Sequence, residues 1–284
     1  PKNWIDIAKE AATHIKKGVK GGVVTMGTDT MHYAASALSF MLNPLSAPII
    51  ITGAQRSGDR GSTDGSTNLL ASVIAAKKWD GGEAVICMHA NMSDEYNFIL
   101  RGNKARKMHT ERRDAFRPIN IKPLGKVYID GRIENINEHR EKSEETKIDT
   151  KIDEKVALLM SYPSFDGKII DYYVDEGIHG LVIAATGFGN LPTANENLIK
   201  ALKHANEKGV PIVITSQTVY GRTNKFVYKT SREMSSFQNI IYVDDMTTET
   251  AFTKLMFVLG HRKKLEDINE MMRTPLAGEM SERS

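Results

Sequence analysis

Apolar, β-branched runs alternate with helix-periodic segments along this chain, and this alternation restricts the possible folds more than any other feature. In the first half, the apolar runs lie at 23–25, 49–53 and 83–89, and the helical patterns at 4–15, 31–42 and 68–77. Strands joined through helices form right-handed βαβ units, in which the strands are parallel and helices cover both faces of the sheet. The first half is therefore predicted to be an α/β domain built on a parallel sheet.

A charged segment, residues 137–155, interrupts the alternation. It is dense in charged residues and poor in large apolar ones, a composition typical of a solvated linker. The alternation then restarts, with predicted strands at 156–162, 180–185 and 211–216 and predicted helices at 169–176, 196–208, 248–259 and 264–272. We therefore predict two doubly wound α/β domains: a larger N-terminal domain over residues 1–143, a linker over 144–155, and a smaller C-terminal domain over 156–284.

The composition narrows the functional classes. With 40% hydrophobic and 26% charged residues the chain has the composition of a soluble globular protein, and no apolar run approaches the roughly 18 residues of a membrane helix. A net charge of +3 is too small to indicate a nucleic-acid binder by itself. The single cysteine, Cys87, lies in an apolar run and is expected to be a buried, unreactive thiol. We expect a cytoplasmic protein that does not bind a membrane.

The Gly27-Thr28-Asp29-Thr30 stretch stands where the first apolar run gives way to a helix. Ligands of open α/β sheets bind beyond the carboxyl ends of the strands, so this is a position for reactive side chains. Asp29 and Thr30 are also good helix N-cap residues, and spacing alone favours the cap. Both interpretations stay open, because a cap and a reaction site are compatible.

Two further stretches could carry a site. Residues 52–57 end the next apolar run and lead into a loop of small polar residues, whose backbone N–H groups could face an anion or a carbonyl oxygen; an ordinary surface loop is favoured. Residues 101–117 carry seven Lys or Arg residues, which indicate a phosphate-binding patch or, as favoured here, a β-hairpin with a solvated basic face. His89 and His109 have no partners at metal-ligand spacing, so we expect no zinc site.

Five motifs in a fixed order connect these stretches. They are GTDTM at 27–31, ITGAQRSGDRGSTDGSTNLL at 51–70, RKMHTERRDAF at 106–116, ATGFGNLP at 185–192 and KVALLMSYPSFDG at the start of the second predicted domain. In these motifs the chain resembles the asparaginase/glutaminase family of amidohydrolases over essentially its whole length. Within that family, the segments GTDTMHYAASALSFML, RGNKARKMHTERRDAFRPIN and PLAGEMSERS are more similar to the archaeal-type glutamyl-tRNA(Gln) amidotransferase D subunits than to free asparaginases.

The resemblance implies a reaction centre with two threonines. In this family the first threonine, in a Thr-Gly-Gly-Thr motif, attacks the carbonyl carbon of a side-chain amide, and the second acts with a lysine and an aspartate. By position, the second threonine is Thr28, the lysine is Lys107 and the aspartate is Asp29. A threonine hydroxyl needs a base before it can act as a nucleophile, and a lysine amine serves as that base only where burial or positive charge lowers its pKa.

The same resemblance assigns supporting roles. Arg101, Arg106 and Arg112 are expected to place positive charge near the lysine. Asp29 would orient Lys107 and receive the α-ammonium group of the substrate. Substrate contacts are expected from Gly27, Ala54, Gln55 and Asn190, the last of which would reach a neighbouring active site from the second domain.

Two departures from the family pattern affect this centre. Met26 stands where the family usually carries a histidine, so a hydrogen-bonding group beside the threonine is lost. No Thr-Gly-Gly-Thr occurs in the 284 residues. Because the chain opens on Pro1, directly in a helical pattern, we expect the first threonine and the small N-terminal domain usual in these D subunits to lie in an upstream part.

The resemblance implies an amidotransferase subunit that releases ammonia from glutamine or asparagine. A partner subunit of the E type would use this ammonia to convert Glu-tRNA(Gln) to Gln-tRNA(Gln). The partner would also use ATP and Mg²⁺, with no cofactor and no metal in this chain, and a homodimeric core is expected. A stand-alone L-asparaginase is one alternative, and an inactive scaffold is another if the first threonine is absent.

Overall fold

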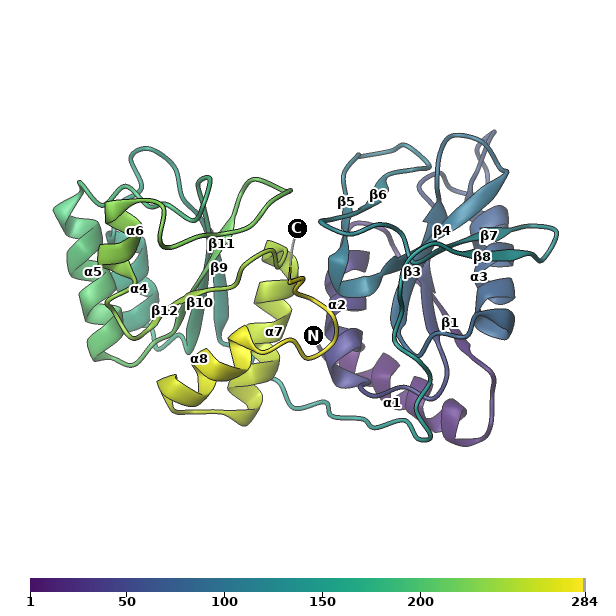
Figure 1. The fold of residues 1–284 in the computed structure, drawn as a ribbon, viewed down its shortest axis with the longest axis horizontal. Coiled ribbons are helices and arrows are strands. Elements are labelled where there is room, and N and C mark those ends of the chain that lie inside the picture. Colours follow the sequence, from purple (N-terminus) through teal and green to yellow (C-terminus); the bar gives the residue numbers. More distant parts are fainter. Residues whose placement is uncertain (283–284) are drawn as a thin grey trace. The chain divides into compact units, whose positions relative to one another are not determined.

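The structure is a computed structural model that describes residues 1–282, and it divides into two compact units (Figure 1). The first unit is Pro1–Thr150, and the second begins at Lys151. Each unit has its own parallel strands with helices on both faces, so the predicted α/β fold class is confirmed.

The first unit is built on a six-stranded sheet with the strand order β1-β2-β3-β4-β7-β8. Its strands are β1 (Gly22–Thr25), β2 (Ile49–Thr52), β3 (Ala84–His89), β4 (Tyr96–Arg101), β7 (Gly125–Tyr128) and β8 (Ile133–Asn135). Its helices are α1 (Lys2–Lys16), α2 (Met31–Met41) and α3 (Gly65–Lys78). Outside this sheet, η1 (Gly102–Lys104) leads into a separate hairpin of β5 (Ala105–Lys107) and β6 (Phe116–Pro118).

The first three strands are parallel, as the alternating pattern predicts. Val23 pairs with Ile50, and Ile50 pairs with Val85. Every residue of β2 and β3 is buried, because α1 and α2 lie on one face of the sheet and α3 on the other (Figure 1). The carboxyl ends of β1, β2 and β3 therefore meet at one edge, from which the loops that follow β1 and β2 emerge together.

The other half of this sheet is antiparallel, which the pattern of apolar runs did not predict. β4 pairs antiparallel with both β3 and β7, and β7 with β8. β7 and β8 have only four and three residues, and charged side chains such as Lys126 and Glu134 alternate with apolar ones. Such short, half-solvated strands carry no continuous apolar run, so a search for buried parallel strands misses them.

The charged segment after β8 is not a free linker. Its backbone N–H groups donate to carbonyl oxygens of the first unit, with Ser143 bound to Leu45 at 2.9 Å and Asp149 bound to Met41 at 2.8 Å. Thr146 is buried, and its hydroxyl lies 2.8 Å from that of Ser46. The prediction of a solvated segment is therefore corrected up to Thr150: its charged side chains face outward while its backbone continues the first unit. The predicted linker, 144–155, contains the point at which the chain passes between the units.

The second unit holds a four-stranded, wholly parallel sheet with the order β12-β11-β10-β9. Its strands are β9 (Val156–Met160), β10 (Gly180–Ala185), β11 (Ile212–Ser216) and β12 (Ile240–Tyr242). The helices are α4 (Lys168–Asp175), α5 (Glu196–Glu207), α6 (Lys229–Met234), α7 (Thr248–His261) and α8 (Leu265–Arg273). α4 and α5 cover one face and α7 the other (Figure 1). The short elements α6 and β12 were not predicted.

Cys87 lies on β3 with none of its surface exposed. Together with Ile50 and Val85 it packs against Ala71 and Ala75 of α3. Burial raises the pKa of its thiol to about 12, so the reactive thiolate is scarce at neutral pH. The expected buried, unreactive thiol is confirmed. Within residues 1–282, none of the helices combines the length and the apolar character needed to cross a bilayer.

Candidate active site

Lys107, Thr28 and Asp29 come together at the carboxyl edge of the first sheet. The Lys107 ammonium, at the end of β5, donates to the Thr28 hydroxyl oxygen at 2.9 Å and to an Asp29 carboxylate oxygen at 2.7 Å. Thr28 and Lys107 are 79 residues apart in the sequence, and only the packing of the hairpin above the β1–α2 loop joins them. The resemblance therefore identified three side chains that are in direct contact.

Burial gives the three side chains different environments. Thr28 is 8% exposed and the Lys107 side chain 13%, whereas the Asp29 side chain is 92% exposed. The hydrogen bond from Lys107 and its positive charge lower the pKa of Asp29, which therefore stays ionised at neutral pH. The buried Thr28 hydroxyl thus lies beside the Lys107 amine, which the Asp29 carboxylate orients. The exposed side of that anion is open to a positively charged ligand.

The helix cap that spacing favoured is not formed by these side chains. α2 begins at Met31 with Thr30 in the N-cap position, and no side chain makes the capping hydrogen bond. Instead, backbone N–H groups inside the helix donate to the carbonyl oxygens of Thr28 and Thr30. The carboxylate of Asp29 is bound to Lys107, so the structure favours the site interpretation of this stretch.

The loop after β2 is held in one shape by a buried carboxylate. Asp64 has no exposed surface and accepts hydrogen bonds from the backbone N–H groups of Gln55 and Arg56 at 3.0 Å. A Cβ atom at Gly53 would lie 2.3 Å from the carbonyl oxygen of Met26, so only glycine fits where the loop passes the β1–α2 turn. The loop lies on the surface over residues 57–62, as expected, while these contacts brace its start beside Thr28.

Among the expected substrate-contacting residues, Gln55 is the one whose contacts are clearest. Its side-chain amide donates to the carbonyl oxygen of Arg112 at 3.1 Å, which joins the loop after β2 to the hairpin that carries Lys107. Ala54 and Gly27 are exposed on the two neighbouring loops. The backbone of Met26 fixes its position, because its N–H donates to the carbonyl oxygen of Thr52 and continues the β1–β2 pairing. The substrate contacts of all these residues stay predictions.

The basic stretch 101–117 contains the predicted β-hairpin, but its charges are largely neutralised. Arg101 binds Glu83 at 2.8 Å, Arg112 binds Asp114 at 2.8 Å, and Arg113 binds Asp94 at 2.7 Å. Burial alone would raise the pKa of Asp114, but the bond from Arg112 and the charges of Arg117 and Arg112 outweigh it and lower the pKa. Arg101 and Arg112 are therefore each paired with a carboxylate, and their expected role as sources of positive charge for Lys107 stays a prediction.

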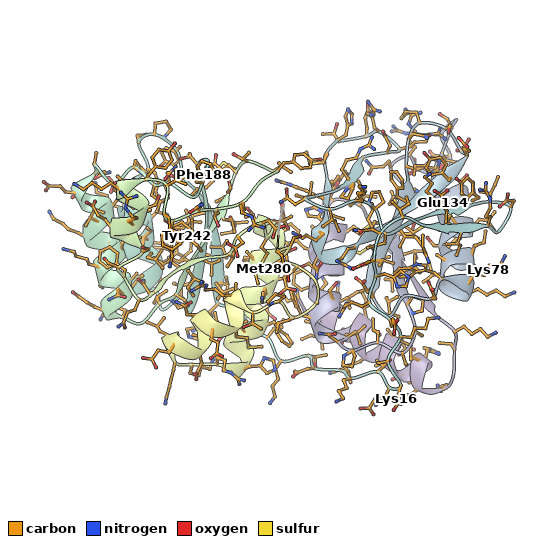
Figure 2. The ribbon with its side chains drawn as sticks, viewed as in Figure 1. Lys16, Lys78, Glu134, Phe188, Tyr242 and Met280 are labelled. Atoms are coloured by element: carbon orange, nitrogen blue, oxygen red, sulfur yellow. The ribbon has the colours of Figure 1, made fainter. Side chains whose placement is uncertain are left out.

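Asn190 lies in the second unit, in a turn between β10 and α5. Its side-chain oxygen accepts from the Ser231 hydroxyl at 2.7 Å, and its backbone pairs with Thr186. Gly189, at φ +97°, is packed against the ring of Tyr242, which is labelled in Figure 2. These contacts hold Asn190 in place within its own unit, and its reach to another active site stays a prediction.

Sequence reasoning missed Asp64, Asn68 and His89, whose buried side chains lie behind the site. An Asp-Gly pair before a helix indicates an N-cap, and Asp64 does occupy that position, yet its side chain turns to the loop instead. A polar residue inside an apolar pattern was the available signal for the other two. Among residues 1–282, no group of three or more His, Cys, Asp or Glu side chains could hold a metal ion.

Together these features define a class: a two-unit α/β protein with a Thr–Lys–Asp centre at the carboxyl edge of its first sheet. Residues 1–141 match the family described as "Asparaginase, N-terminal", and residues 155–272 match "Glutaminase/Asparaginase C-terminal domain". The chain belongs to the asparaginase/glutaminase family.

Relatives and solved structures agree with this assignment. The chain is 46% identical over 283 residues to the D subunit of the glutamyl-tRNA(Gln) amidotransferase of Pyrococcus furiosus, covering 99% of this chain and 64% of that protein. It is 43% identical over 288 residues to the D subunit of the same name from Methanobrevibacter smithii, again covering 64% of it. The chain thus spans less than two thirds of the length of these curated relatives.

Two solved structures have the same fold over nearly the whole chain. The thermostable L-asparaginase from Thermococcus kodakarensis superposes with a TM-score of 0.89 at 27% identity, covering 99% of this chain and 82% of that one. L-asparaginase I from Vibrio cholerae gives a TM-score of 0.84 at 30% identity, covering 99% of this chain and 81% of that one.

Proposed function

We propose that this chain carries the Thr–Lys–Asp half of an amide-hydrolysing centre that releases ammonia from glutamine or asparagine for tRNA-dependent amidation. The observation that carries the proposal is the contact of Lys107 with Thr28 at 2.9 Å and with Asp29 at 2.7 Å. A lysine amine fixed by a carboxylate and placed on a shielded hydroxyl is suited to moving protons during acyl transfer.

In the proposed reaction, a first threonine attacks the carbonyl carbon of the amide. The C–N bond breaks, ammonia leaves with a proton from the centre, and water then cleaves the resulting ester. Once Lys107 has given up a proton, its amine can accept one from the Thr28 hydroxyl across the same hydrogen bond. Asp29 stabilises the lysine whenever it becomes an ammonium ion again.

The exposed edge of β1 supports the delivery of the first threonine by a further strand. β1 ends the strand order, and its residues are only partly buried, unlike those of β2. A groove of ≈ 390 Å³ lies at this edge, and its apolar lining includes Ile7 of α1, Val19 of the α1–β1 connection and Val24 of β1. A strand paired parallel to β1 would cover these side chains, and its carboxyl end would lie near Thr28.

The exposed carboxylate supports an amino acid as the amide donor. Asp29 is ionised and open to solvent on the side away from Lys107, where an α-ammonium group can bind it. The braced loop at Ala54 and Gln55 lies next to this position and would face the side-chain amide. Glutamine and asparagine both carry the required groups.

The curated relatives support the wider assembly. Their shared name, the D subunit of glutamyl-tRNA(Gln) amidotransferase, implies a partner subunit, which we propose is of the E type and performs the ATP- and Mg²⁺-dependent step on Glu-tRNA(Gln) in the cytoplasm. Leu69, Leu70 and Val73 of α3 are each 45–50% exposed, an apolar stripe suited to a protein contact such as a homodimeric core.

A stand-alone L-asparaginase is the second candidate, because both superposed structures are asparaginases. The two functions differ in whether ammonia release depends on the partner subunit and Glu-tRNA(Gln). Ammonia release is measured with the full-length gene product, with glutamine and with asparagine, in the presence and absence of the E-type partner and Glu-tRNA(Gln). We expect release from glutamine to rise when partner and Glu-tRNA(Gln) are added.

Two other outcomes would decide against the proposal. Turnover of asparagine that neither partner nor tRNA accelerates would establish the stand-alone asparaginase. No release from either amino acid, even in the complete complex, would leave the inactive scaffold, as the Met26 substitution and the missing Thr-Gly-Gly-Thr motif suggest.

A further inference from the structure

A hydrogen-bonded series of polar side chains, most of them buried, runs behind the site. It connects the loop after β2 with the hairpin loop that follows Lys107. It starts at Asp64, which holds the N–H groups of Gln55 and Arg56, and continues to Asn68, whose amide donates to Asp64 at 2.9 Å. Next comes His89, whose Nδ1 lies 2.6 Å from the side-chain oxygen of Asn68. Asp64, Asn68 and His89 are at most 1% exposed.

The hydrogen-bonded series ends on the hairpin loop that follows Lys107. The Nε2 atom of His89 lies 2.9 Å from a carboxylate oxygen of Asp94, in the β3–β4 turn. The same oxygen accepts a hydrogen bond from Arg113 at 2.7 Å. The substrate-facing loop after β2 and the loop that carries Arg113 are thus joined through five side chains in series.

Which atoms donate and which accept along this hydrogen-bonded series determines which atoms carry protons. The Asn68 amide nitrogen faces the carbonyl oxygen of Gly53 and the carboxylate of Asp64, which are acceptors only, so its orientation is determined. The Asn68 oxygen therefore accepts, and Asn97 also donates to it at 2.6 Å. Nδ1 of His89 must donate to this oxygen, while Nε2 faces a carboxylate that can only accept while it is ionised.

We propose that His89 is a positioning residue, protonated on both ring nitrogens, that links Asn68 to Asp94 and so holds the loop after β2 and the Lys107 hairpin in register. The proposal deepens the proposed function and rests on it for its catalytic meaning. The surroundings fit a buried cation: Asp94 supplies the opposing charge, and the hydrogen bond from His89 lowers the pKa of Asp94. The catalytic distance of 2.9 Å between Lys107 and Thr28 depends on that register.

The first test reads the protons directly and does not need activity. The full-length protein is labelled with ¹⁵N-histidine, and the His89 signals are assigned by their loss in His89→Gln, with His179→Gln, which alters a histidine of the second unit, as the control. We expect protons on both nitrogens of His89 at neutral pH. A neutral ring with a single proton would overturn the proposal.

The second test breaks the hydrogen-bonded series of side chains at its exposed end, where a substitution does not threaten folding. The Asp94 side chain is 59% exposed, and the amide introduced by Asp94→Asn can donate to Nε2, so His89 no longer needs its second proton. Glu95→Gln removes an exposed carboxylate in the same turn and is the matched control. In Asp94→Asn we expect His89 to become singly protonated and the N–H groups of Gln55 and Arg56 to exchange faster with solvent.

The same pair of variants gives the kinetic readout. Loss of register should lower kcat/KM for amide hydrolysis by about 10- to 100-fold in Asp94→Asn, with no change in Glu95→Gln and no change in the thermal midpoint of either. Unaltered exchange and unaltered kcat/KM in Asp94→Asn would overturn the positioning role even if His89 is a cation. Since NMR and exchange need no turnover, they separate a failure of this proposal from a failure of the proposed function.

Discussion

Lys107→Ala is expected to lower kcat for amide hydrolysis by about 10²- to 10⁴-fold, the range contributed by a positioned acid or base. The reason is that its amine is the one group seen within hydrogen-bonding distance of both Thr28 and Asp29 among the described residues. KM for the amide donor should change much less, because Asp29 remains available for the α-ammonium group. Ammonia release by the full-length protein, assayed with the proposed E-type partner and Glu-tRNA(Gln), measures both constants.

A matched control shows whether the loss is specific. Lys122 is an exposed lysine of the same unit, so Lys122→Ala removes equal charge and similar bulk. It should leave kcat unchanged. If Lys107→Ala kept the activity of Lys122→Ala, the assignment of Lys107 as the proton-transfer group would be wrong.

Glu279→Gln is expected to destabilise the second unit by about 3–5 kcal/mol, the usual cost of leaving a buried charge unpaired. Lys254 and Glu279 are both fully buried, and the ammonium lies 2.5 Å from the carboxylate. Lys254 also donates to the carbonyl oxygens of Met272 and Thr274, while Glu279 accepts from the N–H groups of Leu276 and Ala277. The pair thus fastens the segment around Met280, labelled in Figure 2, to α7.

Urea unfolding can locate this effect. Both tryptophans, Trp4 and Trp79, lie in the first unit, so their fluorescence transition should stay in place while the far-UV circular dichroism transition of the second unit moves to lower urea. Glu233→Gln, which breaks an exposed pair with Lys229, should change stability by no more than about 0.5 kcal/mol. Equal, small effects in both variants would contradict the structural role of the buried pair.

The effect of Glu279→Gln should also depend on pH. Burial alone would raise the pKa of Glu279, but the charge and hydrogen bond of Lys254, with the two backbone N–H groups, outweigh it and lower the pKa. A carboxyl whose pKa is lower in the folded state contributes stability that is complete above its unfolded pKa and is lost as pH falls through the folded value. The gap between the wild type and Glu279→Gln should therefore be largest near neutral pH and shrink in acid.

Much of the fold could be predicted from the sequence because buried parallel strands are continuous apolar runs. The strands at 49–52 and 84–89 have this character, and the pattern of apolar residues located α2 and α7 within a few residues. β7 and β8 could not be found this way, since they are short and face solvent on one side. The acidic and basic side chains of 137–150 indicated solvent correctly, but the hydrogen bonds of its backbone leave no trace in composition.

The site could be predicted only in part, and for a physical reason. Spacing placed Thr28 and Asp29 at the carboxyl end of a strand but favoured a helix cap, and nothing in spacing alone connects them to Lys107, 79 residues later. The resemblance to the family made that connection. It was silent on His89 and Asp94, whose role depends on which buried atoms face each other in three dimensions.

We have proposed that residues 1–284 hold one half of a two-threonine centre, with the attacking threonine supplied from outside them. The most direct test measures ammonia release from glutamine and asparagine by residues 1–284 alone, shown to be folded by circular dichroism. The full-length gene product is assayed beside them with the proposed E-type partner and Glu-tRNA(Gln). We expect release by the full-length protein and none above background by residues 1–284. Robust amide hydrolysis by residues 1–284 alone would contradict the proposal.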